Sequence, residues 1–141
     1  MTHMQEPIQL KMTLPKIPDI ELVALEGLER LARHLGIAEE KIGEARIIVT
    51  EAIINAFEHG GDRNPRTEVE FTLTQKEVVI FVRDFGRGFE PADVETPTIE
   101  GKLKSKSKRG WGLNLMKSLS DDFRIESDSN GTTITIRKLL A

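Results

Sequence analysis

The chain of 141 residues carries a formal net charge of −3 and 38% hydrophobic residues, so we expect one compact domain spanning residues 1–141. It has no cysteine, which excludes disulfides, thiolate catalysis and zinc–thiolate sites and fits a reducing compartment. No apolar run near the start is long enough for a signal peptide or a membrane-spanning helix, and the slightly acidic balance gives no global basic face for duplex nucleic acid. We therefore expect a cytoplasmic protein that binds neither membrane nor nucleic acid, with any anion site confined to a local patch.

The first half of the chain predicts one strand followed by two helices. Residues 8–14 alternate apolar and polar side chains, as a half-buried strand does, and two prolines follow. Asp19 is the expected N-cap of a helix that runs to about residue 35 and stops at Gly36. A second helix is expected from about Ala38 to the pair Gly60-Gly61.

The second half predicts two hairpins separated by a loop and a short helix. Strands 68–74 and 77–83 are joined by a tight turn, so we expect them to pair antiparallel. Residues 84–109 keep no apolar period and end in a lysine-rich run, which is typical of a mobile loop; a lid is expected over about 91–109. A short helix over 111–118 precedes the last hairpin, which turns at Asn130-Gly131.

The second helix has two different faces when it is drawn at about 100° per residue. One face is apolar, and the other gathers Glu44, Glu51, Asn55, Glu58 and His59. A solvated surface explains Glu44 and Glu58 taken singly. Glu51 and Asn55 are flanked by apolar residues, and a carboxylate there would be costly to bury without a partner.

The stretch VRDFGRGFEP places Asp84 directly after a strand, with Gly86 and Gly88 behind it. This pattern is compatible with a tight turn that a carboxylate caps. It is equally compatible with a ligand site, in which the glycines let a flat ligand lie close to the backbone while Asp84 accepts a hydrogen bond from an exocyclic amine. Adenine carries such an amine.

A third stretch, KRGWGLNLMKSL, sets Gly110 and Gly112 at the start of an apolar helix. Backbone N–H groups there can point at an anion, and the helix dipole favours negative charge. A glycine-hinged helix after a basic loop remains the alternative. The spacing of a Walker A loop is missing, and a Rossmann site would need a preceding strand.

Taken in order, these three stretches resemble the GHKL ATPase superfamily. VTEAIINAFEHG is similar to its N box, RDFGRGF to its first glycine box and KRGWGLNLM to its second, and SNGTTITI is similar to the Gly-Thr-Thr strand that closes the site. The resemblance implies an α/β two-layer sandwich, with helices covering one face of a mixed, mostly antiparallel sheet. ATP is then expected between the helices and a lid.

The same resemblance implies roles for single residues. Asn55 would coordinate Mg²⁺, Asp84 would accept from the adenine amino group beside Gly86 and Gly88, and Thr133 would complete the water network near adenine. Backbone N–H groups of Gly110, Gly112 and Leu113 would face the phosphates. The candidates to close on the triphosphate are Lys104, Lys106, Lys108 and Arg109.

Within the superfamily, the short chain and the Glu-x-x-x-Asn-x-x-x-His pattern look like the bacterial anti-sigma-factor serine/threonine kinases. On that model Glu51 is the general base for a serine of an anti-anti-sigma (STAS-like) partner, and His59 has a structural role. Residues 20–28 are apolar and acidic where some members carry a basic partner-binding residue, which leaves sigma-factor binding open and allows a homodimer surface instead. A non-catalytic, nucleotide-gated binding module is the alternative function.

Overall fold

The computed structural model describes residues 6–60, 66–86 and 109–141, except for the side chains of residues 109–111. All the predicted strands and helices are present, with ends within two residues of the expected positions. In chain order they are β1 (Ile8–Pro15), α1 (Glu21–His34), α2 (Glu39–Gly60), β2 (Arg66–Leu73), β3 (Glu77–Asp84), α4 (Arg109–Leu119), β4 (Asp122–Asp128) and β5 (Gly131–Leu139). Most of the predicted loop and lid, residues 87–108, lies outside the described residues.

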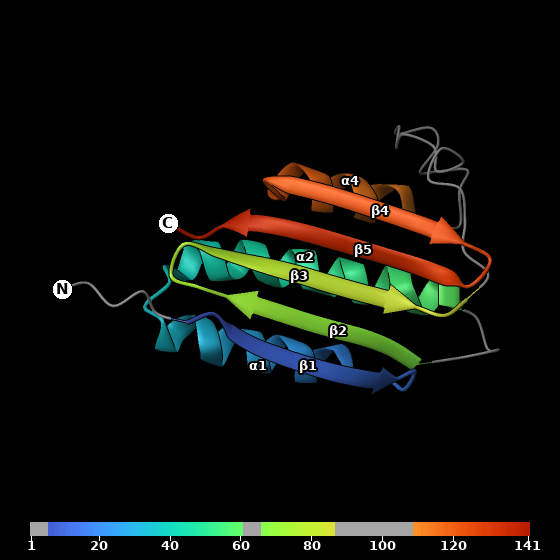
Figure 1. Cartoon of the computed structure of the whole chain (residues 1–141), viewed down its shortest axis with the longest axis horizontal. Coiled ribbons are helices and arrows are strands. Elements are labelled where there is room, and N and C mark those ends of the chain that lie inside the picture. The colour runs from blue at the N-terminus through green and yellow to red at the C-terminus, as the bar shows by residue number, and fades with distance from the viewer. Residues whose placement is uncertain (1–5, 61–65, 87–108) are drawn as a thin grey trace.

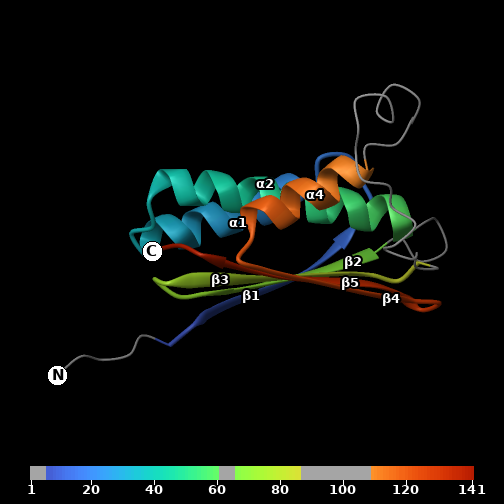
Figure 2. The same ribbon diagram turned by 90° about the horizontal axis from the view of Figure 1, so that it is seen from above.

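The described strands form one sheet in the order β1-β2-β3-β5-β4, and every neighbouring pair is antiparallel. The expectation of a mixed sheet is thereby replaced by a fully antiparallel one. The three described helices cover a single face of this sheet, and no other described element covers the opposite, open face (Figures 1 and 2). The predicted two-layer α/β sandwich is confirmed.

The core lies between the two layers because each strand alternates its side chains between them. β2 and β3 bury every second residue against the helices, and the outward residues remain partly exposed. α2 is the central helix of the layer and contacts α1, α4 and three strands. Its buried face consists of Ile42, Ala45, Ile48, Val49, Ala52, Ile53, Asn55, Ala56 and Gly60, so Asn55 is the polar exception.

The two ends of α1 compare differently with the predictions. At its C-terminal end Gly36 has φ 75°, Gly36 N–H donates to Arg33 C=O, and Ile37 N–H donates to Ala32 C=O, each at 3.0 Å. This is a Schellman motif, so the predicted stop is confirmed. At the other end Asp19 is not the N-cap: it has φ 63°, the capping position falls on Ile20, and no side chain caps the helix.

The C-terminal ends of α2 and β3 and the N-terminal end of α4 all lie at the same end of the molecule (Figures 1 and 2). These are the three segments that carry the predicted ligand-binding motifs. The fold therefore collects motifs from distant parts of the sequence at one edge of the helix–sheet seam. None of the described helices has the length and hydropathy needed to cross a membrane.

Candidate functional site

Asn55 carries the most informative polar group on α2. The residue is 5% exposed, and its Oδ1 has no hydrogen-bond partner among the residues that the structure describes. Leaving a buried acceptor unsatisfied costs about 1–3 kcal/mol, so the fold alone gives no reason to place an amide here. A ligand that binds this oxygen would supply the reason.

A magnesium ion fits that oxygen. Mg²⁺ prefers hard oxygen ligands and commonly takes one or two from the protein and the rest from phosphates and water. Within the described ranges no group of three or more histidine, aspartate or glutamate side chains could hold a metal. Asn55 would hold the ion together with a bound phosphate chain, as the resemblance implies.

Glu51 lies one turn before Asn55 and faces the start of α4. A Cβ placed on Gly112 would come within 2.7 Å of the Glu51 Oε2 atom, so the carboxylate packs directly against the glycine backbone. The first N–H groups of a helix lack intrahelical acceptors and attract anions. The arrangement places a half-buried carboxylate and a candidate phosphate site side by side.

Asp84 is the last residue of β3 and is 1% exposed. Its Oδ1 accepts hydrogen bonds from the N–H groups of Gly86 at 3.0 Å and Thr132 at 3.3 Å. Burial raises the pKa of the Asp84 carboxyl, and these two N–H groups oppose the rise. Among the described residues its hydrogen bonds use Oδ1 alone, which leaves Oδ2 to accept from a ligand amine.

Gly86 brings Asp84 close to the end of α2. A Cβ at Gly86 would lie 2.7 Å from Gly60 Cα and closer still to the backbone oxygen of His59. Only a residue without a side chain allows this approach. Through it, the β3 motif and the α2 motif share one end of the seam.

Thr133 does not belong to this site, and its prediction is wrong. On β5 it pairs with the exposed Arg83 and lines a hollow on the open face of the sheet. Its neighbour Thr132 pairs with Asp84, is 2% exposed and gives its backbone N–H to that carboxylate. Adjacent residues of a strand point to opposite faces, so only one threonine of the pair can face the helices.

A comparison with protein families adds an independent observation. Residues 18–138 match the model of the histidine kinase-like ATPase domain. The chain belongs to this family.

Several relatives of this ATPase domain carry kinase or anti-sigma names. A serine-protein kinase RsbW from Oceanobacillus iheyensis is 28% identical over 94% of this chain and 87% of its own length. An anti-sigma F factor from Clostridium novyi is 30% identical over 72% of this chain and 73% of its own length. The predicted resemblance to the anti-sigma-factor kinases is confirmed.

Solved structures share the fold of the ATPase domain at low sequence identity. A structure of the RsbU and RsbW domains of a Mycobacterium tuberculosis protein matches with a TM-score of 0.68 at 22% identity, covering 94% of this chain and 32% of that chain. This chain thus spans about a third of that longer one. The SiaB–SiaC complex from Pseudomonas aeruginosa gives 0.61 at 13% identity, over 96% of this chain and 90% of that chain.

The second glycine box of the ATPase domain is only partly described. Gly110 and Gly112 lie in the first turn of α4, as predicted. Leu113 is the fifth helical residue and is 6% exposed, so its N–H has an intrahelical acceptor and its side chain belongs to the core. Five further predicted contacts lie outside the described residues or side chains: Gly88, Lys104, Lys106, Lys108 and the side chain of Arg109.

The two other acidic residues on the predicted polar face of α2 have different surroundings. Glu58 is exposed, as a solvated position predicts. Glu44 is partly exposed and paired: its Oε2 lies 2.5 Å from Nζ of Lys138, and the hydrogen bond from this lysine lowers the pKa of Glu44. Nothing in the helical periodicity of α2 could reveal a partner on the last strand.

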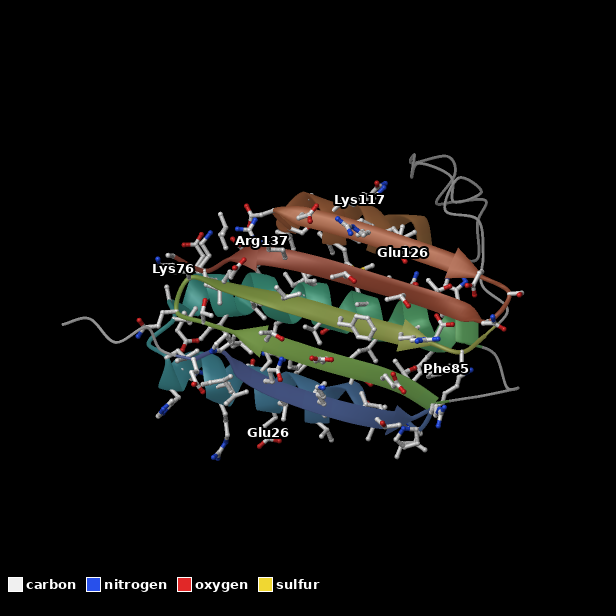
Figure 3. The ribbon with its side chains drawn as sticks, in the orientation of Figure 1. Glu26, Lys76, Phe85, Lys117, Glu126 and Arg137 are labelled. Carbon is white, nitrogen blue, oxygen red and sulfur yellow. The ribbon has the colours of Figure 1, made fainter. Side chains whose placement is uncertain are left out.

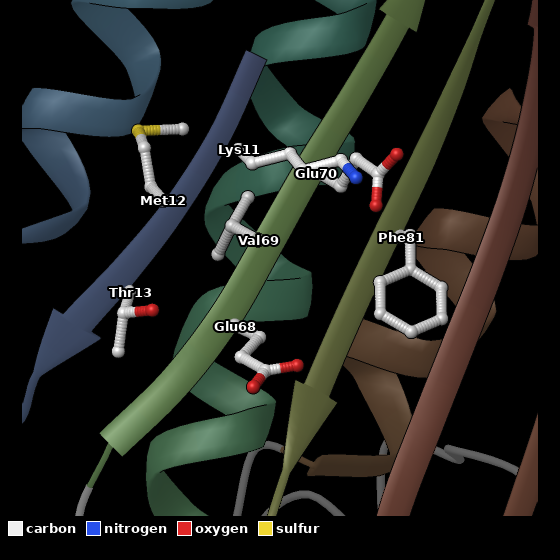
Figure 4. A pocket seen from close by; sticks show the side chains of 7 residues that line it. All are labelled: Lys11, Met12, Thr13, Glu68, Val69, Glu70 and Phe81. Carbon is white, nitrogen blue, oxygen red and sulfur yellow. The ribbon is translucent and has the colours of Figure 1, made fainter. Parts of the chain in front are cut away.

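The open face of the sheet carries hollows that are separate from this site. Arg137 and Glu126, labelled in Figure 3, mark this face. One hollow of about 360 Å³ mixes carboxylates, an amine and an aromatic ring (Figure 4). Its lining residues are Lys11, Met12, Thr13, Glu68, Val69, Glu70 and Phe81. None of them is a predicted site residue.

Proposed function

We propose that this protein is a cytoplasmic, ATP-binding anti-sigma regulatory factor that phosphorylates a serine or threonine of an anti-anti-sigma (STAS-like) partner. The observation that carries the proposal is the contact between the Glu51 carboxylate and Gly112 at the start of α4, one helical turn from the unsatisfied oxygen of Asn55. A candidate base, a candidate metal ligand and a candidate phosphate site thus meet in one place.

The adenine end of ATP fits the other half of the seam. Asp84 Oδ2 would accept a proton of the exocyclic amine, and Gly86 keeps the neighbouring backbone open to a flat ring. Thr132 holds the Asp84 carboxylate in place through its N–H group. This carboxylate is fixed by the fold and buried, so an adenine amine would replace little water when it binds.

The transfer step requires little beyond positioning and charge neutralisation. The hydroxyl oxygen of the partner attacks the γ-phosphorus while its proton passes to the Glu51 carboxylate; the bond from that phosphorus to the β–γ bridging oxygen breaks, leaving ADP. Magnesium held by Asn55 would neutralise charge on the phosphates. The N–H groups at the start of α4, including that of Gly110, would hold the phosphate chain.

The partner proposals rest on names and on surface chemistry. One relative is named an anti-sigma F factor, and we extend the proposal to a sigma factor as a second partner.

Ile17, Leu22 and Val23 are about half exposed at the corner between β1 and α1, where β1 is an edge strand. We include a homodimer through this corner in the proposal; Val23→Glu should then lower the mass measured by light scattering from dimer to monomer.

The test of the kinase is transfer of labelled phosphate from ATP with Mg²⁺ to a STAS-like protein encoded in the same operon. Glu51→Ala should abolish transfer and retain ATP binding. Glu58→Ala is the matched control, because it removes an exposed carboxylate from the same helix and should leave transfer intact. If wild type and both variants bind ATP and partner without any transfer, the kinase proposal fails and a nucleotide-gated binding module remains.

A further inference from the structure

Lys138 is a buried lysine with two defined partners. It lies on β5 on the helix side of the sheet, is 3% exposed, and Nζ donates to Glu44 Oε2 at 2.5 Å and to the Leu119 carbonyl at 2.8 Å. A buried ammonium is tolerated only where charge and hydrogen bonds compensate its desolvation. This side chain therefore ties together β5, α2 and the last residue of α4.

The end of α4 is held by further contacts on both sides of Lys138. Asp121 N–H donates to the Arg137 carbonyl at 2.9 Å, and the Leu139 N–H donates to Asp121 Oδ2 at 2.7 Å. Three successive residues of β5 thus bind the connection that leaves α4. Of these three residues, Lys138 is the one that contacts α4 itself. Its positive charge also interacts favourably with the negative C-terminal end of the α4 dipole.

α2 and α4 are linked at two places, and the number of residues between these places is the same on both helices. On α2, Glu44 precedes Glu51 by seven residues; on α4, Gly112 precedes Leu119 by seven residues. Seven residues correspond to a rise of about 10 Å. One contact is the Lys138 cluster at Glu44 and Leu119, and the other is the packing of Gly112 on Glu51. A shift of α4 at the Lys138 cluster would therefore also move Gly112 relative to Glu51.

We propose that Lys138 is a positioning residue that fixes α4 against α2 and thereby sets the phosphate-binding start of α4 opposite Glu51. It touches no reacting atom, and the inference rests on the proposed nucleotide site. The adenine half of that site is built by β3, Gly86 and Thr132 rather than by α4. Loss of Lys138 should therefore weaken contacts to phosphate while contacts to adenosine persist.

The test compares Lys138→Met with Arg137→Met. Arg137 is the adjacent residue on the same strand, faces the open side of the sheet and pairs with Glu77, so its variant removes an equal charge without touching α4. Dissociation constants for ATP with Mg²⁺ and for adenosine are measured by calorimetry at a temperature where both variants are folded. Lys138→Met should raise the dissociation constant of ATP by about tenfold, the effect of losing about one hydrogen bond to a charged group, and leave that of adenosine within about twofold.

A second readout needs no nucleotide. Amide hydrogen exchange over residues 113–119 should be faster in Lys138→Met than in wild type or Arg137→Met, and exchange in β2 and β3 should stay the same. Equal weakening of ATP and adenosine, or unchanged exchange in α4, would overturn the inference. If wild type binds neither ligand, the proposed nucleotide function fails, and the exchange measurement still decides whether Lys138 fixes α4.

Discussion

Gly86→Ala is the substitution whose effect the structure defines most sharply. Gly86 follows β3 at the point where the chain passes the last turn of α2. A methyl group there would lie 2.7 Å from Gly60 Cα and 2.9 Å from Gly60 C, and closer to the His59 backbone oxygen. These neighbours are backbone atoms of a helix, so they cannot rotate away as a flexible side chain would.

The magnitude follows from two separate losses. Inserting a methyl group into packed structure costs about 1–3 kcal/mol. Moving Gly86 away also breaks its hydrogen bond to the buried Asp84 carboxylate, and hydrogen bonds to charged groups contribute about 1.5–3 kcal/mol. The expected loss is therefore about 2.5–6 kcal/mol, a large share of the roughly 5–15 kcal/mol by which domains are stable.

Urea denaturation followed by circular dichroism measures this loss, and Gly43→Ala provides the matched control. Gly43 lies inside α2, and a Cβ there meets nothing within 4 Å. Alanine is a better helix former, so Gly43→Ala should stabilise the fold by about 0.5–1 kcal/mol. A Gly86→Ala protein with the same denaturation midpoint as wild type would refute the packing argument.

Three further predictions concern the site. Burial raises the pKa of Asp84 above its ordinary 3.8, so the folded protein binds this proton more tightly than the unfolded chain does. The free energy of unfolding of the wild type should therefore fall as the pH rises from 3.8 through the raised pKa of the folded state. Asp84→Asn should lack this fall in urea denaturation measured at several pH values, and it should bind ATP more weakly. Gly112→Ala should reduce phosphate transfer with little change in melting temperature, because its methyl group would displace only the end of the Glu51 side chain; a stable variant with normal transfer would contradict this. Thr132→Val should weaken adenosine binding measured by calorimetry and Thr133→Val should not, because only the Thr132 hydroxyl, which pairs with Ser127 Oγ, lies on the Asp84 side of the sheet; the reverse result would return the assignment to Thr133.

Local patterns in the sequence were sufficient for the elements and for much of the site. The apolar stripe of α2 predicts most of its buried face, and the apolar residues that flank Asn55 on the other face mark it as a covered polar residue. Asp84 was placed at the end of a strand because alternation stops there. Gly36 ends α1 because its positive φ suits glycine, a property of the residue itself. In each case the pattern that decides the prediction lies within a few residues of the position.

Contacts between segments that are distant in sequence could not be predicted from such local patterns. The partner of Glu44 is Lys138 on the last strand, and no periodicity in α2 indicates it. The family resemblance assigns this role to Thr133, although the apolar residues Ile134 and Ile136 show which face of β5 is buried. Counting back by two from Ile134 gives Thr132, so the sequence alone could have identified the threonine on the buried face. It contains no comparable signal for the contact between Glu44 and Lys138.

The two buried polar groups of the seam share a physical property that distinguishes them from Lys138. Lys138 is buried with a carboxylate and a carbonyl as acceptors for its ammonium group, so its desolvation is compensated within the fold. Asn55 keeps an unsatisfied oxygen, and burial raises the pKa of Asp84 although two N–H groups donate to it, so each group carries a desolvation cost that its contacts within the fold do not fully offset. Groups that weaken the fold where they stand, yet lie together at one end of the seam, are explained by binding. Replacing Asn55 with leucine should thus stabilise the protein against urea while removing Mg²⁺-dependent ATP affinity, and a loss of both would mean that Asn55 serves the fold itself.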